Sequence, residues 1–260
     1  MSIDAPSRIL VAQSGEAKTR HSLGGYLVMP AVLAAVCLAL YVYVATKELD
    51  SIEARALSVG RLSTALWQHV QLTAVSTVLT LLVAVPLGIV LTRPFARRIQ
   101  PFLITLLTLG QAVPTIAILV LLAVAFLFLG FQAAIVGLVL YAIVPVLLNT
   151  MVGLEQVDPA VLEAGRGMGM SRLTVLRRLE LPLAVPVVLA GIRTALVINV
   201  GTATLVTYIN AGGLGDVIVA GLSTNRFTVQ LVGAVLTAVL ALTIDYLAGI
   251  AEALLRPRGL

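Results

Sequence analysis

Few residues of this 260-residue chain are of the types that do covalent or metal chemistry, and they lie far apart. His21 and His69 are the only histidines, Cys37 is the only cysteine, and Lys18 and Lys47 are the only lysines. A catalytic site needs a clustered nucleophile and base, or a set of metal ligands. Neither lysine belongs to a G-x-x-x-x-G-K-[ST] sequence, the loop that cradles nucleotide phosphates. The sequence therefore predicts no catalysis, no metal site and no cofactor site in this chain.

One polar stretch, Glu155–Leu181, has residue spacing that instead suggests docking to a partner. Asp158 and the proline after it predict a helix start, with a side-chain acceptor at the N-cap and proline at the first helical position. Three glycines at alternate positions weaken this helix after about two turns. Ser171 can cap a second helix. We expect two short helices, Pro159–Arg166 and about Arg172–Glu180, joined by a glycine hinge.

This segment resembles the EAA loop of the permease subunits of binding-protein-dependent ABC importers. In that family Glu-Ala-Ala, three further residues and Gly are followed, ten positions after the glycine, by Ile-x-Leu-Pro. The positions that match are Glu163, Ala164, Gly169, Leu181 and Pro182. Gly165 replaces the second alanine and should soften the helix, whereas Leu179 replaces the isoleucine and keeps an apolar contact. The alternative is an amphipathic connecting loop, which a bare Glu-Ala-Gly would fit.

The resemblance implies that this loop is a coupling helix, seated in a groove of an ATPase carried by a separate chain. ATP and Mg would then bind to that ATPase and not to this chain. The resemblance also implies two such ATPase subunits, a second permease subunit that is identical or related, and an extracytoplasmic substrate-binding protein.

A broader resemblance covers residues 110–117, 140–154, 191–205 and 211–218, which are similar to the osmoprotectant branch of these importers. That branch imports glycine betaine, choline, carnitine or proline betaine. Methionine and other permeases share parts of these stretches, so a permease for another small solute, such as an amino acid, is the alternative. Asn210 stands where the branch is expected to have glycine, which leaves the shape of the outer loop open.

The composition places these residues in a membrane. Hydrophobic residues make up 60% of the chain and charged residues 11%, whereas soluble domains carry about 25% charged residues. The mean hydropathy is +1.07. The net charge of +5 does not indicate nucleic acid, because the charges lie in loops between apolar runs. We expect an all-α, polytopic protein surrounded by lipid in a bacterial cytoplasmic membrane.

Six apolar runs are long enough to cross a bilayer, which takes roughly 20 residues. We expect spans at about 23–46, 67–92, 102–129, 132–154, 182–209 and 228–255. Pro114 predicts a kink or break in the third span. With both termini inside, twelve of the 17 lysines and arginines lie in the cytoplasm and four lie outside, as the positive-inside rule favours.

The chain then divides into four parts. They are a cytoplasmic tail at 1–22, a first span with an outer amphipathic segment at 23–66, a five-helix permease core at 67–255 containing the coupling loop at 155–181, and a cytoplasmic C-terminus at 256–260. Residues 47–61 have apolar side chains at helical spacing, so we expect a short helix on the outer surface.

Polar or helix-breaking residues within the expected spans are candidates for a transport pathway. They are Gln111, Pro114, Thr115, Asn149, Asn199, Thr202, Thr204 and Thr207. The alternative for each polar residue is interhelical hydrogen bonding, worth on the order of 1 kcal/mol. Aromatic residues make up only 5% of the chain, too few to favour a cation–π cage for a quaternary ammonium cargo. We therefore expect selectivity to lie in the external binding protein.

Charged and glycine positions add three further expectations. Arg193 and Asp245 should lie at similar depth and pair, because unpaired charges within a membrane are costly. His69, near the outer end of the second span, should be an interfacial residue without a partner. The glycines of the outer loop predict either a plain turn or a contact with the binding protein or an outer gate. These glycines are Gly212, Gly213 and Gly215.

Two other classes fit the sequence less well. A secondary transporter should show ion-coupling carboxylates or repeats, yet only Asp245 and Glu252 lie in the spans. A membrane enzyme would need the clustered chemistry that is missing. Neither class explains the spacing from Glu163 to Pro182.

Overall fold

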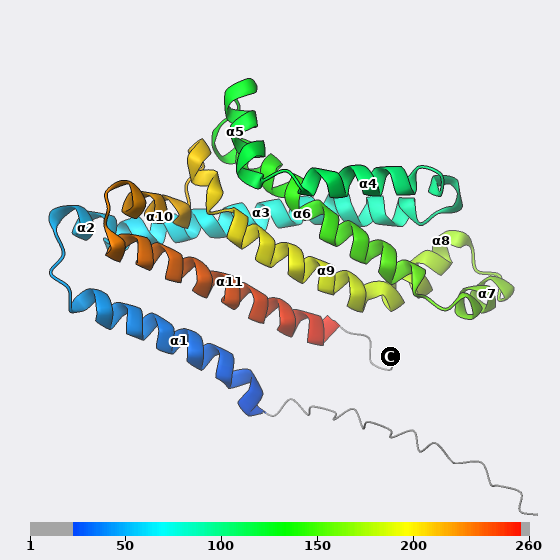
Figure 1. Cartoon of the computed structure of the whole chain (residues 1–260). Helices are drawn as coiled ribbons and strands as arrows, with labels where there is room; N and C mark the ends of the chain where they lie inside the picture. The colour runs from blue at the N-terminus through cyan, green and yellow to red at the C-terminus, as the bar shows by residue number, and fades with distance from the viewer. Residues whose placement is uncertain (1–22, 256–260) are drawn as a thin grey trace, which may run out of the picture.

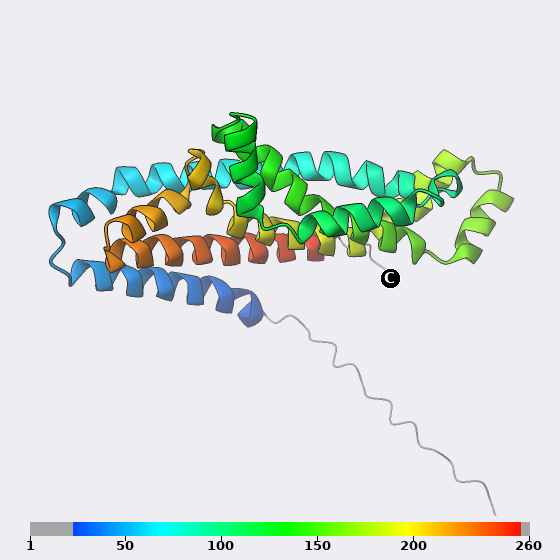
Figure 2. The same cartoon turned by 45° about the horizontal axis from the view of Figure 1, so that its top comes forward.

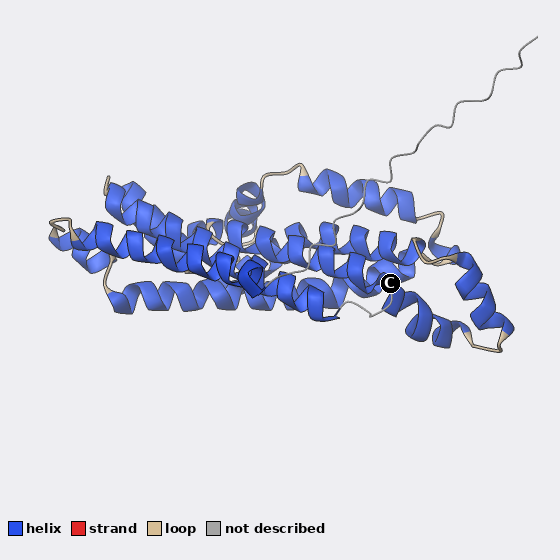
Figure 3. Ribbon diagram, turned by 90° about the horizontal axis from the view of Figure 1, so that it is seen from below, coloured by secondary structure: helices blue, strands red, loops and turns tan. Residues whose placement is uncertain are grey.

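The computed structural model describes residues 23–255, and their regular structure is entirely helical (Figure 3). The α-helices are α1 (Leu23–Ala45), α2 (Ser51–Ala56), α3 (Val59–Leu91), α4 (Gln100–Gln111), α5 (Thr115–Ala125), α6 (Gly130–Glu155), α7 (Pro159–Gly167), α8 (Arg172–Val175), α9 (Leu181–Thr202), α10 (Leu214–Ser223) and α11 (Phe227–Leu255). Two short 3-10 helices cover Pro94–Ala96 and Leu205–Ile209, and a π-helical turn covers Leu176–Glu180. The expected cytoplasmic tail at 1–22 and C-terminus at 256–260 lie outside the described residues.

The long helices α3, α6, α9 and α11 run side by side along an elongated bundle (Figures 1 and 2). Helix α6 packs against both α3 and α9, and α9 also packs against α11. Helix α1 lies on the outside of the bundle, in contact with α11. Helices α2 and α10 lie at one end of the bundle, and α7 and α8 lie at the opposite end.

The number and length of the apolar helices agree with a protein that crosses a membrane several times. Within residues 23–255, five helices are long and apolar enough for a span, and a sixth span results if α4 and α5 count as one. The predicted all-α, polytopic architecture is therefore confirmed.

The third apolar run is broken where Pro114 predicts a break. Helix α4 ends at Gln111, α5 begins at Thr115, and the two axes differ by 87°. Pro114 has an extended ψ of 133° and immediately precedes α5. A proline has no N–H to continue a helix, and its ring collides with the preceding turn. The α5 segment consequently projects from the long face of the bundle (Figure 1).

The outer segment expected at 47–61 is shorter than predicted, and the second span is longer. Helix α2 covers only Ser51–Ala56, capped by Asp50, which accepts backbone N–H bonds from Ile52 and Glu53. The Glu53 N–H in particular, together with Arg226, holds the pKa of the Asp50 carboxyl below its ordinary value. Helix α3 begins at Val59 instead of Trp67. Its first turns pack against α2 and α10, where Ala65 is buried together with Leu214 and Val217.

The loop between the fifth and sixth spans is more structured than predicted. Helix α9 ends at Thr202, and a 3-10 turn replaces the expected last turns of the span up to Ile209. A further helix, α10, follows and buries Leu214, Val217 and Gly221. It packs against α3 and α11. This helix was missed because its ten residues are too few to stand out from the apolar runs beside it.

Close helix packing depends on small residues at the α6–α9 contact. A Cβ added at Gly191 of α9 would lie 2.5 Å from Asn149 Cβ and 3.0 Å from the Pro145 carbonyl oxygen of α6. Small residues let helix backbones approach closely in membranes, where no hydrophobic effect drives helices together. The α6–α9 contact is therefore one of close backbone approach.

Replacing Gly191 with alanine should loosen this contact, because neither the Pro145 carbonyl nor the Asn149 Cβ can withdraw without moving α6. Overpacking of this kind costs roughly 1–3 kcal/mol, so the midpoint of thermal unfolding of the purified chain should fall by several degrees. Gly201→Ala in the same helix is the matched control, since nothing lies within 4 Å of its added Cβ. Equal midpoints for the two variants would contradict the close approach.

Candidate functional site

The first helix of the loop predicted to couple transport to ATP hydrolysis forms from local signals. The Asp158 carboxylate accepts a 2.8 Å bond from the Ala160 N–H at the start of α7, and Pro159 occupies the first helical position. The helix ends at Gly167, and Gly169 adopts a φ of +83°, which side chains disfavour. Glu163 and Ala164 are exposed on α7. The helix and its exposed residues lie at the tip of the bundle (Figure 1).

The second predicted helix is not separate from the fifth span. Ser171 caps α8 by accepting from the Thr174 N–H at 3.3 Å, and α8 continues through the π-helical turn directly into α9. The Leu181 N–H bonds to the Leu176 carbonyl, five residues back. Pro182 explains the wider turn, because a proline in a regular helix has no N–H to give and collides with the carbonyl four residues earlier.

The two residues that depart from the EAA pattern lie against each other. Gly165 is buried, and a Cβ added there would lie 2.6 Å from Leu179 Cδ1. Leu179 is half-buried, as are Leu181 and Pro182 at the start of α9. The missing methyl group at residue 165 therefore makes room for the leucine side chain, and the contact fastens α7 onto the turn before α9.

Replacing Gly165 with alanine should destabilise the loop, and Leu179→Val should relieve the clash by removing both δ-methyl groups. We expect the double variant to be more stable than the sum of the single effects by roughly 0.5–3 kcal/mol, the range for residues in direct contact. Thermal unfolding of all three variants measures this. Gly167→Ala in the same helix is the control, since its added Cβ meets nothing within 4 Å. Additive effects would contradict the contact.

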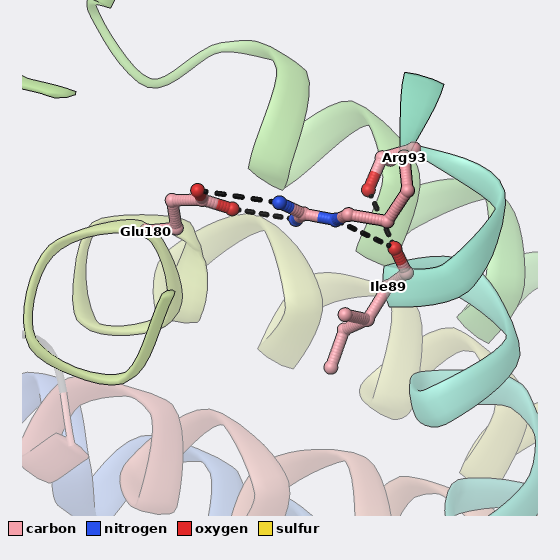
Figure 4. Close-up of polar contacts among 4 residues, drawn as sticks. Ile89, Arg93 and Glu180 are labelled. Carbon is pink, nitrogen blue, oxygen red and sulfur yellow. Dashed lines mark hydrogen bonds and ion pairs between the residues drawn. The ribbon is translucent and has the colours of Figure 1, made fainter. Parts of the chain in front are cut away.

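An ion pair that the sequence did not suggest joins this loop to the end of α3 (Figure 4). Arg93 binds the Glu180 carboxylate through both terminal nitrogens, with Nη2–Oε2 at 2.5 Å and Nη1–Oε1 at 3.3 Å. Its Nε donates to the Ile89 carbonyl at 3.0 Å. Glu180 is 5% exposed. Glu180 occupies the variable position of Ile-x-Leu-Pro, so the motif itself gave no signal for it.

The pathway candidates are spread over α4, α5, α6, α9 and the turn after α9, and seven of the eight are polar. Three bond to another element: Gln111 donates to the Tyr141 carbonyl at 3.1 Å, Asn199 donates to Thr77 Oγ1 at 3.1 Å, and Thr207 donates to the Asp216 carboxylate of α10. Others bond to backbone of their own segment, namely Asn149 to Pro145, Thr202 to Ile198 and Thr204 to Gly201. Thr115 is buried at the start of α5, next to Pro114 at the break. For most of the pathway candidates, these bonds fit the alternative that the polar side chains make structural hydrogen bonds within or between helices.

The prediction for His69, an interfacial residue without a partner, is wrong. The side chain is fully buried and has two hydrogen-bond partners. The Leu214 N–H donates to its Nδ1 at 3.2 Å, so Nδ1 is unprotonated. Its Nε2 therefore carries the proton and donates to the Val200 carbonyl at 2.9 Å. One neutral ring thus connects α3, the end of α9 and the start of α10, through contacts distant in sequence.

The outer glycines shape this same junction. Gly212 and Gly213 have φ values of +82° and +100°, and the Gly213 N–H donates to Gln68 Oε1 at 3.2 Å. A Cβ added at Gly215 would collide with the Thr204 carbonyl oxygen. Thr207 donates to the Asp216 carboxylate in the first turn of α10. The loop is therefore held against the first turns of α3 by hydrogen bonds to Gln68 and His69.

Arg193 and Asp245 form an ion pair between α9 and α11, with Nε–Oδ1 at 2.5 Å and Nη2–Oδ2 at 2.7 Å. Glu252, two turns further along α11, lies 3.8 Å from Arg193 Nη1. The three side chains are between 30% and 41% exposed. Charges are costly against lipid, so this part of the α9–α11 surface is suited to face another protein subunit or water.

Replacing Arg193 with glutamine should be the most damaging change in this cluster, because two carboxylates would then repel each other within the span. Adding Asp245→Asn to that variant should restore part of the folded yield, since one of the carboxylates is removed. Asp245→Asn alone should be the mildest, because Glu252 remains as a partner for Arg193. The measure is monodisperse protein recovered from membranes. Equal yields for Arg193→Gln with and without Asp245→Asn would contradict this ranking.

Comparison with known proteins gives the same family as the resemblance of the loop to the EAA sequence. A family model described as "Binding-protein-dependent transport system inner membrane component" matches residues 84–258. The chain is 40% identical to the carnitine transport permease protein OpuCD of Listeria monocytogenes, over 74% of this chain and 85% of the relative. It is 39% identical to the choline transport system permease protein OpuBB of Bacillus subtilis, over 77% and 91%. It is also 39% identical to the osmoprotectant import permease protein OsmY of Salmonella typhimurium, over 69% and 76%.

Solved structures show the same fold. A chain of the MetNI methionine ABC transporter in an inward-facing conformation matches with a TM-score of 0.66, over 75% of this chain and 96% of that chain, at 23% identity. A second crystal form of the same transporter gives a TM-score of 0.65 at 24% identity.

Proposed function

Because the chain belongs to the family of binding-protein-dependent transport system inner membrane components, we propose that it is the permease subunit of an ATP-driven importer of osmoprotectants. The names of the relatives support the cargo class, since they specify carnitine, choline and osmoprotectants. We include glycine betaine and proline betaine in that class, because all four compounds carry a quaternary ammonium group. The chain itself is a membrane subunit and the hydrolysis takes place elsewhere.

The observation that carries this proposal is the position of the loop from α7 to the start of α9. It presents exposed Glu163 and Ala164 at one tip of the bundle. Arginines gather at this end, both in the turn after α3 and in the loop itself. They are Arg93, Arg97, Arg98, Arg166, Arg172, Arg177 and Arg178. The positive-inside rule supports a cytoplasmic position for this end, and cytoplasmic termini with it.

The division of labour follows from this orientation. Two ATPase subunits would bind ATP and Mg and would each receive one coupling loop, so a second permease, identical or related, completes the complex. Displacement of α7 by the ATPase would pass through the contact of Gly165 with Leu179 into the continuous helix that runs from Arg172 to Thr202. The work of ATP hydrolysis would thereby reach the middle of the membrane.

The opposite end of the bundle is suited to meet the substrate-binding protein. Here α10 and the rigid outer glycine turn close over α3, and a hollow of about 370 Å³ lies between α3 and α10. Its polar lining consists of Arg61, Thr64, Gln68 and Asp216. Cargo selectivity would then reside in the binding protein, and this chain would supply the gated path.

Reversing the charge at Glu163, by Glu163→Arg, should abolish coupling without unfolding the chain, because the side chain is exposed. The complex is reconstituted in proteoliposomes with the ATPase and the binding protein of the same transport system. ATP-dependent uptake of labelled glycine betaine, carnitine and choline is then measured. We expect uptake to fall by roughly tenfold or more, which corresponds to about 1.4 kcal/mol of lost coupling.

Glu48→Arg, the same charge reversal at an exposed residue of the outer end, is the matched control and should leave uptake unchanged. Normal uptake by Glu163→Arg would contradict the coupling role. Uptake of an amino acid but of no quaternary ammonium compound would keep the permease assignment and contradict the cargo.

A further inference from the structure

The Arg93–Glu180 ion pair joins the end of α3 to the start of α9. Arg93 directly follows the end of α3, and Glu180 ends the π-helical turn that leads into α9. The two residues are 87 positions apart in sequence. Two parallel N–H···O bonds fix both the distance and the plane of the carboxylate, as a guanidinium does when it meets carboxylate in this fork-to-fork manner.

The surroundings make this pair difficult to open. Glu180 is the only buried carboxylate among residues 28–255. A buried charge that loses its partner is strongly unfavourable. A third hydrogen bond fixes the Arg93 side chain to its own helix, because its Nε donates to the Ile89 carbonyl in the last turns of α3 (Figure 4). The guanidinium therefore cannot turn away from Glu180 without giving up three hydrogen bonds.

The segment that carries Glu180 is itself fastened to the coupling loop. The Leu179 side chain, one residue earlier, lies against Gly165 of α7. Val175, at the end of α8, is 1% exposed and faces the same glycine. A displacement of α7 must therefore carry Glu180 with it, and Glu180 must carry the end of α3.

We propose that Arg93 and Glu180 are positioning residues that make the inner end of α3 move together with the coupling loop. This inference rests on the proposed function. Motion imposed on α7 is passed by the contact of Gly165 with Leu179 to the turn before α9. From there it reaches the bundle by two routes, along the helix into α9 and through the ion pair into α3. Because α3 is joined to α10 at its outer end by Gln68 and His69, the second route extends from the ATPase side to the outer loop.

The test measures coupling separately from assembly. Arg93→Gln, Glu180→Gln and the charge swap of Arg93→Glu with Glu180→Arg are each reconstituted with the ATPase and binding protein. The readouts are co-purification of the subunits, ATP hydrolysed, and solute taken up. Arg98→Gln is the control, since Arg98 is exposed in the turn that follows α3 and makes no ion pair within the described residues.

We expect the single variants to assemble and to hydrolyse ATP, but to use roughly five times or more ATP for each solute molecule transported. The charge swap should recover most of that loss, because an ion pair can form again. Arg98→Gln should match the unmodified chain. Single variants that assemble with an unchanged ratio of ATP to solute would overturn the inference.

Two further outcomes are also decisive. If the single variants fail to assemble, a charge swap that assembles with restored coupling supports the inference, and a swap that does not assemble contradicts it. If the unmodified chain shows no ATP-dependent uptake at all, the proposed function fails and not the role of this pair alone.

Discussion

The segment Arg172–Glu180 cannot shift without the span that follows it, because helical hydrogen bonding runs unbroken from Arg172 to Thr202. Helix α7 is fastened to this segment by the contact of Gly165 with Leu179. The π-helical turn at Leu176–Glu180 preserves this continuity where Pro182 would otherwise break it. A rigid helix transmits displacement along its axis, whereas a flexible linker would absorb it. The other long helices pack around this continuous helix. Helix α9 lies in the centre, in contact with α3, α6 and α11.

Helix α3 is the second element on which the arrangement depends, because both of its ends are fixed by side chains. In its third turn, on the side of α10, Gln68 and His69 accept the N–H groups at the start of α10. Just past its C-terminal end, Arg93 binds Glu180. Between these ends the buried polar face of α3 carries Thr73, Ser76, Thr77 and Thr80. Ser76 and Thr80 donate to carbonyls of their own helix, and Thr77 accepts a hydrogen bond from Asn199 of α9.

Local sequence signals predicted a large part of this structure. Apolar runs of sufficient length predicted the spans, Pro114 predicted the break, and Asp158 with Pro159 predicted the start of α7. Each of these depends on residues within a turn or two of one another. The Arg193–Asp245 ion pair is a different case, because it was expected from the rule that charges in a span need partners, and the structure places the two side chains in contact.

Contacts between distant residues account for what the sequence did not reveal. His69 is bonded to groups 131 and 145 positions away, so its burial could not be inferred from its neighbours. The Arg93–Glu180 pair spans 87 positions, and both residues lie in polar stretches where an exposed charge is the ordinary expectation. The contact of Gly165 with Leu179 explains two departures from the family pattern that looked independent in the sequence.

On this arrangement, the tip of the bundle at α7 should contact an ATPase on another chain. The most direct measurement places a photoreactive amino acid at residue 163, and in a second variant at exposed Thr64 on the outer end, in cells that produce the whole complex. Irradiation should crosslink residue 163 to the ATPase subunit and should not crosslink residue 64 to it. A crosslink to the ATPase from residue 64, or its absence from residue 163 in an assembled and active complex, would show that α7 is not the part of the chain that meets the ATPase.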